Sequence, residues 1–160
     1  MIQKATLSQF SRILAIYDGA REFMAANGNP NQWGNAYPPE DMIRQDILKG
    51  KCYVNLKDDD IRAVFYFNLE QDPTYGYIEG AWLNDDPYGV IHRLAVGDNG
   101  RGIAAECFDF ALSRCKNLRI DTHEDNLPMQ RCLAKNGFVR CGIIYLEDGD
   151  PRIAYHKIKE

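Results

Sequence analysis

The chain has 160 residues, of which 45% are hydrophobic and 26% charged, a composition typical of a single globular domain over residues 1–160. Its formal net charge of −4 argues against nucleic acid as a partner, because phosphate binding favours a basic face. No apolar run approaches the roughly 18 residues that a membrane span needs, and the first residues lack the order of a secretory signal, so we expect a cytoplasmic protein without a membrane partner.

Five cysteines and three histidines bear on redox and metal chemistry. No two cysteines have Cys-x-x-Cys spacing, and the histidines are widely separated. We therefore expect reduced, partly buried thiols and no metal site. The cysteines are Cys52, Cys107, Cys115, Cys132 and Cys141.

The chain begins with a predicted short strand and a helix. Thr6 and Gln9 have the spacing of a capping box, and apolar residues at helical spacing follow them. Residues 27–39, rich in Gly, Asn and Pro, predict a loop, and this loop carries Trp33 and Tyr37. Two large aromatic side chains are costly to leave in water, so we expect the loop to pack against the protein.

A second helix and a pair of strands are predicted next. Pro39 is suited to the start of this helix and Gly50 to its end. Residues 52–56 and 61–69 have strand character and are separated by the polar turn 57–60.

The middle of the chain predicts a strand, a glycine loop and a helix. Residues 75–83 are aromatic and predict an extended segment, and residues 88–96 predict the strand that enters the loop. A helix over 102–116 and a strand over 118–122 follow.

The C-terminal part predicts a helix from Pro128 to Asn136-Gly137 and a closing hairpin of residues 138–146 and 152–157. The central strand-helix-strand order implies a parallel pair, whereas the hairpins are antiparallel. We therefore expect an α/β fold with a mixed, mostly antiparallel sheet of about six or seven strands and helices on both faces.

The glycine loop is the most informative segment. An apolar strand ends in it and a helix begins directly after it, so unpaired backbone N–H groups and the helix dipole together form a site for a pyrophosphate-sized anion. The preceding strand could hydrogen-bond an amide-bearing arm of the same ligand. By itself Gly-x-Gly before a helix is also compatible with a simple tight turn.

The wider context resembles a known family. Asn99-Gly100-Arg101-Gly102-Ile103-Ala104 resembles the acyl-CoA-binding motif of the GCN5-related N-acetyltransferase (GNAT) family, with Asn99 where the family carries Gln or Arg. Residues 120–126 and 133–138 resemble the family's fifth strand with its Asn and its helix ending in x-Gly-Phe. The resemblance covers nearly the whole chain and implies the acyl-CoA N-acyltransferase fold, in which two central strands splay apart.

The resemblance also implies the ligand and its contacts. Acetyl-CoA is the implied co-substrate, with its pantetheine arm paired to the main chain of Leu94, Ala95 and Val96. Residues 100–104 would hold the pyrophosphate through Gly100, Arg101, Gly102, Ile103 and Ala104. Asn126 matches the pantetheine-binding Asn, and it also has the position of a helix cap.

The groups that move protons are less defined by the resemblance. Asp121 lies where some members carry a catalytic Glu, although it could instead pair with Arg119. Glu79 and His92 are rival bases, and simple alternation would place His92 on the same face as Leu94, where it could be packed.

Members of the family often carry a Tyr that acts as general acid toward the departing thiolate, and Leu133 stands at that position here. Tyr145 or a water could take this role instead, unless Tyr145 is only a strand residue. Aromatic and acidic residues favour a small-molecule amine or a peptide as acceptor through cation–π and charge pairing. They are Trp33, Tyr37, Tyr66, Glu79 and Trp82.

The leading hypothesis is therefore an acetyl-CoA-dependent N-acetyltransferase that uses direct attack in a ternary complex. The alternatives are an acyl-CoA-binding module of the same fold without activity, which Leu133 favours, and an interaction protein whose glycine loop is only a turn. A monomer and a homodimer are both compatible with the exposed closing hairpin.

Overall fold

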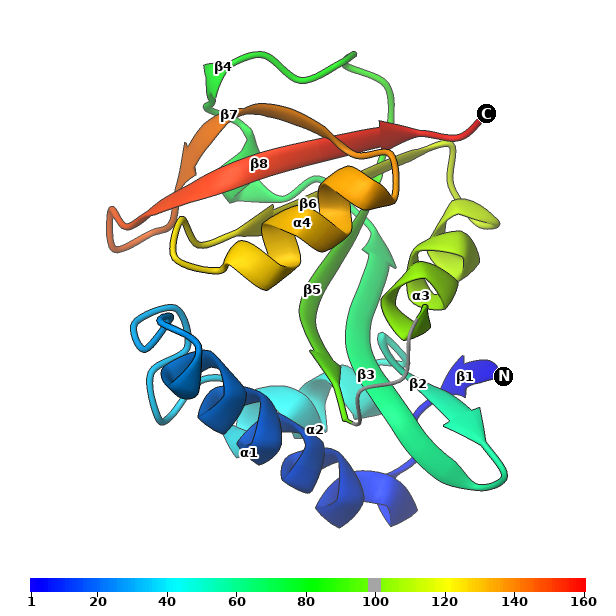
Figure 1. The fold of residues 1–160 in the computed structure, drawn as a ribbon. Helices are drawn as coiled ribbons and strands as arrows, with labels where there is room; N and C mark the ends of the chain where they lie inside the picture. The colour runs from blue at the N-terminus through cyan, green and yellow to red at the C-terminus, as the bar shows by residue number, and fades with distance from the viewer. Residues whose placement is uncertain (98–101) are drawn as a thin grey trace.

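The computed structural model describes residues 1–97 and 102–160. Within these residues eight strands form one sheet in the order β1-β2-β3-β5-β6-β8-β7-β4 (Figure 1). The strands are β1 (Ile2–Lys4), β2 (Cys52–Lys57), β3 (Asp60–Leu69), β4 (Glu79–Gly80), β5 (Gly89–Val96), β6 (Asn117–Thr122), β7 (Val139–Tyr145) and β8 (Pro151–Ile158). The helices are α1 (Phe10–Ala26), α2 (Glu40–Leu48), α3 (Ile103–Leu112) and α4 (Leu127–Lys135), with the short 3₁₀ turns η1 (Leu7–Gln9) and η2 (Pro73–Tyr75).

The expected mixed sheet with a central parallel pair is confirmed. β5 and β6 run parallel, and the other neighbouring strands are antiparallel. Among the described residues only Gly89 and Val90 of β5 have partners on β6, so the two strands separate beyond Val90. The splay lies in the middle of the sheet, between its N-terminal and C-terminal halves.

Helices cover both faces of the sheet, as expected. α1 and α2 bury Ile13, Tyr17 and Ile43 against β2, β3 and β5 on one face. α3 and α4 bury Phe108 and Leu133 on the opposite face, in a core that extends across both halves of the sheet.

The expectation of an extended segment over residues 75–83 was largely wrong. Asp72 caps η2 by accepting a hydrogen bond from the backbone N–H of Thr74 at 2.9 Å, and only Glu79–Gly80 pairs as a strand. Tyr75 and Trp82 instead fold back on the sheet with ring centroids 5.1 Å apart. The aromatic composition here reflects burial by a looped segment and not strand pairing.

Other differences from expectation are small. The sheet has eight strands where about six or seven were expected, and two of them, β4 and β1, are only two and three residues long. α3 ends at Leu112 and not at Lys116.

Gln9 accepts a hydrogen bond from the backbone N–H of Thr6 at 2.9 Å, as the capping-box spacing predicts. In the described part of the chain, no helix combines the length and the apolar character that crossing a membrane requires.

Candidate active site

A β-bulge in β5 organises the centre of the molecule. Tyr66 of β3 faces His92 and Val64 faces Ala95, so the one residue between them on β3 opposes two residues, Arg93 and Leu94. Arg93 has a φ of 52°, a left-handed conformation that is unusual for a residue with a side chain. Bulges of this kind re-aim side chains near active sites.

The bulge separates His92 from Leu94. Leu94 packs with Ile91 in the core beneath α3, whereas the His92 ring lies against Tyr66 and Tyr75, with centroids at 5.8 and 6.0 Å. The expectation that His92 shares a face with Leu94 is therefore wrong. Alternation predicts the face of the sheet that each side chain occupies only while the strand register is unbroken. One extra residue in a strand moves the side chains that follow it to the opposite face.

Buried contacts from α1 and α2 hold the bulge. The Tyr17 hydroxyl donates a hydrogen bond to the main-chain carbonyl of Arg93 at 2.7 Å. The Arg93 guanidinium donates to Asp46 Oδ2 at 2.9 Å and to the Tyr37 hydroxyl at 3.3 Å. Burial would lower the pKa of Arg93, but Tyr37 and Asp46 outweigh it and raise that pKa, so the guanidinium stays charged.

A cavity of about 700 Å³ lies where β5 and β6 diverge. Its walls come from both strands, from the loop between α1 and α2, from η2 and from the β7–β8 hairpin. Leu94 and Thr122 lie on opposite sides of the splay. The Thr122 hydroxyl is buried and has no hydrogen-bond partner among the described residues.

A second hollow of about 320 Å³ lies between the N-terminus of α3 and one side of α4. Gly102 is the N-cap of α3 with a φ of 82°, and among the described residues no side chain caps this helix. Val96, Ile103 and Ala104 line the hollow with Gly102, as expected for a ligand that continues from β5. The predicted contacts of Asn99, Gly100 and Arg101 lie outside the described residues.

Two basic residues that sequence reasoning missed also line this hollow. Arg131 and Lys135 are four residues apart on α4 and exposed. Their spacing shows that they share a helix face, but only the packing of α4 beside α3 shows that this face meets the helix N-terminus.

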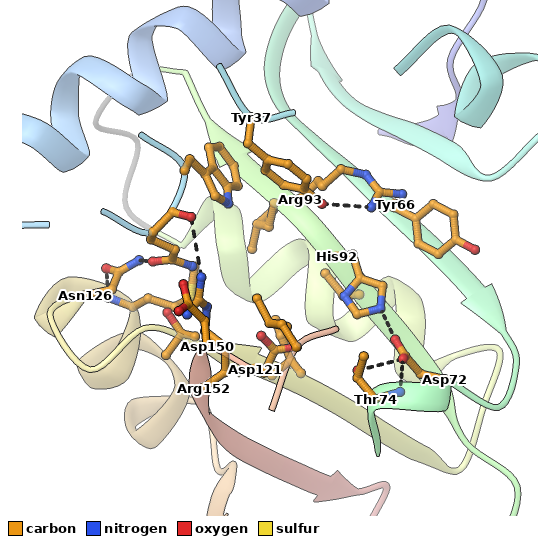
Figure 2. A pocket seen from close by; sticks show the side chains of 18 of the residues that line it. Tyr37, Tyr66, Asp72, Thr74, His92, Arg93, Asp121, Asn126, Asp150 and Arg152 are labelled. Atoms are coloured by element: carbon orange, nitrogen blue, oxygen red, sulfur yellow. Dashed lines mark hydrogen bonds and ion pairs between the residues drawn. The ribbon is translucent and has the colours of Figure 1, made fainter. Parts of the chain in front are cut away.

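Asn126 uses both ends of its amide. Its Oδ1 accepts from the backbone N–H of Met129 at 3.1 Å, which confirms the helix cap. Its Nδ2 donates to Gln32 Oε1 at 2.9 Å, which joins α4 to the loop between α1 and α2 (Figure 2). The pantetheine contact expected for Asn126 stays a prediction.

Asp121 lines the cavity, as the sequence led us to expect. Its Oδ2 accepts a hydrogen bond from the buried Tyr75 hydroxyl at 2.7 Å. The alternative pairing with Arg119 does not form. That guanidinium donates to the carbonyl of Asn84 and lies between the rings of Trp82 and Tyr88.

Glu79 and Tyr145 lie elsewhere. The Tyr145 hydroxyl donates to Glu79 Oε1 at 2.9 Å across the edge strands β7 and β4, and neither residue lines the cavity. Leu133 is fully buried in the core under α4. The strand order places Glu79 and Tyr145 at the edge of the sheet, away from the splay.

Sequence reasoning missed Asp72, which pairs with His92 inside the cavity. His92 Nε2 lies 2.7 Å from Asp72 Oδ2, and the Thr74 hydroxyl donates to Asp72 Oδ1 at 2.7 Å. Burial raises the pKa of Asp72, but hydrogen bonds from His92 and Thr74 outweigh it and bring that pKa to about 2. No sequence signal links residues 72 and 92, because the pairing depends on how η2 folds back.

The remaining cavity wall is aromatic and acidic. Trp33, Tyr37 and Tyr66 line it as expected, whereas Trp82 packs between Tyr75 and His156. Five carboxylates and two arginines also line it, namely Glu70, Asp72, Asp121, Asp148 and Asp150 with Arg93 and Arg152. This wall therefore favours a cationic or aromatic ligand.

Solved structures share this architecture. An acetyltransferase of the GNAT family from Streptococcus agalactiae is 32% identical, with a TM-score of 0.91 over 100% of this chain and 95% of its own. A putative acetyltransferase from Staphylococcus aureus is 25% identical, with a TM-score of 0.72 over 99% of this chain and 98% of its own. An aminoglycoside acetyltransferase in complex with coenzyme A and kanamycin shares the fold at 16% identity and a TM-score of 0.68, over 99% of this chain and 94% of its own.

The fold is that of the acyl-CoA N-acyltransferases, and these structural neighbours are acetyltransferases. The chain belongs to the GNAT family, as the full-length similarity to the streptococcal member shows. No family model matches the sequence, and no curated protein matches it.

Proposed function

We propose that this protein transfers an acetyl group from acetyl-CoA to a primary amine by direct attack while both are bound. One observation carries this proposal: the edge of β5 that faces β6 is unpaired from Ile91 to Val96 among the described residues. This free edge connects the hollow at α3 with the larger cavity. An amide-bearing chain can pair with it as an added strand does.

The residues present fit coenzyme A. The N-terminus of α3 offers main-chain N–H groups and partial positive charge, and Arg131 and Lys135 add two full charges beside it. The main chain of Leu94, Ala95 and Val96 would hold the pantetheine arm. One of these N–H groups, directed at the thioester oxygen, would stabilise the negative charge that develops there.

The cavity on the other side of the splay suits the amine. Trp33 and Tyr66 offer aromatic faces, and the carboxylate of Asp121 can attract an ammonium group. Tyr75 already occupies one oxygen of Asp121, which fixes the orientation of the carboxylate. The fold shared with an aminoglycoside acetyltransferase in complex with kanamycin supports a small-molecule acceptor.

Direct attack agrees with the positions of the thiols. None of the five cysteines lines the larger cavity in the described part of the chain. Burial raises the pKa of Cys52 and Cys107 to about 12, so neither offers a thiolate near neutral pH. When both substrates are bound side by side, the amine can attack the thioester directly, and no cysteine is needed to carry the acetyl group.

The test is a transfer screen at saturating acetyl-CoA against monoamines, polyamines, aminoglycosides and peptide N-termini. Free thiol is measured together with the mass of the product. We expect thiol release matched by an acetylated amine. Titration calorimetry with coenzyme A is run in parallel. Coenzyme A binding without transfer to any acceptor would favour the acyl-CoA-binding module. The absence of both binding and transfer would also overturn the assignment of coenzyme A as the ligand.

A further inference from the structure

We propose that His92 is the proton acceptor in this transfer, and that Asp72, fixed in turn by Thr74, is its positioning residue. This inference rests on the proposed function and deepens it, because it assigns the amine's proton to a residue that the family resemblance did not single out. It also replaces Asp121 in that role.

The geometry of the imidazole carries the inference. His92 Nε2 lies 2.7 Å from Asp72 Oδ2. Figure 2 shows the other ring nitrogen directed away from Asp72 into the cavity. Because an ionised Asp72 only accepts hydrogen bonds, Nε2 must carry the proton. Nδ1, which has no partner among the described residues, then presents its lone pair to the cavity.

Asp72 is itself held in place. Its Oδ1 accepts from both the backbone N–H and the hydroxyl of Thr74, at 2.9 and 2.7 Å, while its own N–H donates to the Tyr88 hydroxyl at 2.9 Å. The rings of Tyr66 and Tyr75 flank the imidazole. A carboxylate that orients an imidazole and stabilises its charged form is the arrangement found in Ser-His-Asp enzymes.

The charged groups around His92 are mostly carboxylates. Asp72 adjoins the imidazole, while Asp121 lies across the cavity. The charged and titratable groups around His92 are Asp72 and Tyr75 from the η2 segment, Tyr66 and Glu70 at the end of β3, Arg93 from β5, Asp46 from α2 and Asp121 from β6. Asp46 forms an ion pair with the Arg93 guanidinium. The other charged groups near His92 are carboxylates.

His92 is better matched to the chemistry than Asp121. An imidazole ordinarily titrates near pH 6.5 and a carboxylate near pH 4, so the imidazole is the stronger base for an amine. Asp121 also has one oxygen engaged by Tyr75. We therefore assign Asp121 to attraction of the ammonium group and His92 to removal of its proton.

His92 Nδ1 takes one proton from the ammonium group of the acceptor and passes it to solvent. The freed nitrogen lone pair forms the N–C bond to the thioester carbon, and the C–S bond breaks with its electron pair leaving on sulfur. The second nitrogen proton neutralises the thiolate through water. One amide, one thiol and one proton result.

The test compares pH profiles of kcat and kcat/KM for wild type, His92→Gln, Asp72→Asn, Asp72→Glu and the control His123→Gln, whose side chain is outside the cavity. We expect His92→Gln to lower kcat by about 100-fold or more and to abolish the acid limb, with an unchanged KM for acetyl-CoA. Asp72→Asn should lower kcat by about 10-fold and move the acid limb to lower pH. Asp72→Glu should recover part of this loss, and His123→Gln should match wild type.

A second variant guards against misfolding. His92→Ala should regain activity when imidazole is added, and coenzyme A titration shows whether each variant still binds. A His92→Gln protein with the wild-type kcat and acid limb would overturn the assignment alone. Wild type that transfers no acetyl group to any acceptor would instead overturn the proposed function, and the assignment with it.

Discussion

The hydroxyl of Tyr17 on α1 donates a 2.7 Å hydrogen bond to the main-chain carbonyl of Arg93, at the left-handed residue of the β5 bulge. Tyr17 is 2% exposed, so this bond forms away from water. The contact joins the helix layer to the position where β5 changes register. It therefore connects the stability of the domain with the placement of His92 on one face and Leu94 on the other.

Removal of this hydroxyl should destabilise the protein. Tyr17→Phe leaves the Arg93 carbonyl without its partner, and we expect a loss of about 1–2 kcal/mol in the free energy of unfolding. Tyr53→Phe is the matched control, because Tyr53 is buried and its hydroxyl has no partner among the described residues. Urea denaturation measures both, and equal losses in the two variants would contradict the role given to the bond.

The Arg93–Asp46 ion pair should contribute far more to the free energy of unfolding than an exposed pair on α2. Asp46→Asn leaves the buried guanidinium without its counter-charge, and we expect a loss of about 3 kcal/mol or more. Asp41→Asn removes the exposed partner of Arg44, where the side chain of Asp41 is 95% exposed, and should cost less than about 1 kcal/mol. Chemical denaturation of the two variants side by side tests this, and similar losses would be inconsistent with a buried pair that holds the bulge.

The basic face of α4 should contribute to coenzyme A binding. Replacing both Arg131 and Lys135 by Gln removes two charges beside the N-terminus of α3, and we expect the Kd for coenzyme A to rise by about 10-fold or more at low salt. Arg140→Gln with Lys159→Gln is the control, because neither residue lines either hollow. Titration calorimetry at two salt concentrations checks it. An unchanged Kd would place the phosphates elsewhere.

His156 should make the fold sensitive to mild acid. Its Nδ1 accepts from the backbone N–H of Leu83 at 3.2 Å and its Nε2 lies 2.8 Å from Asn117 Oδ1, so the neutral ring satisfies both neighbours. Burial, together with the charge of Arg119, lowers the pKa of His156 from 6.5 to about 4. Between these values the unfolded chain binds a proton that the folded protein does not, so stability falls as the pH drops from about 6.5 to about 4.

The effect of His156 is measurable as the slope of the unfolding free energy against pH. Across that window the wild type should lose on the order of 3 kcal/mol through this group, and His156→Gln should show a correspondingly flatter dependence of unfolding free energy on pH. His123→Gln should keep the wild-type slope. A His156→Gln protein with the wild-type slope would assign the acid sensitivity to other groups.

Local sequence patterns determined much of this molecule. The strand that ends at Val96, Gly102 ahead of α3 and Asn126 as the cap of α4 all follow from interactions within a few residues of each other. Such interactions are properties of backbone conformation and nearby side chains, so the chain carries their signal directly. The central parallel pair also followed, because strand-helix-strand order leaves little choice of topology.

The identity of the groups that line the larger cavity depended on tertiary structure. His92 and Asp72 meet because η2 folds back over the sheet, and Glu79 and Tyr145 lie at the edge because the strand order carries β4 and β7 there. A single extra residue at Arg93 inverted the alternation that sequence reasoning extrapolated along β5. Contacts between distant segments depend on register and packing across the whole sheet, which no local period of residues records.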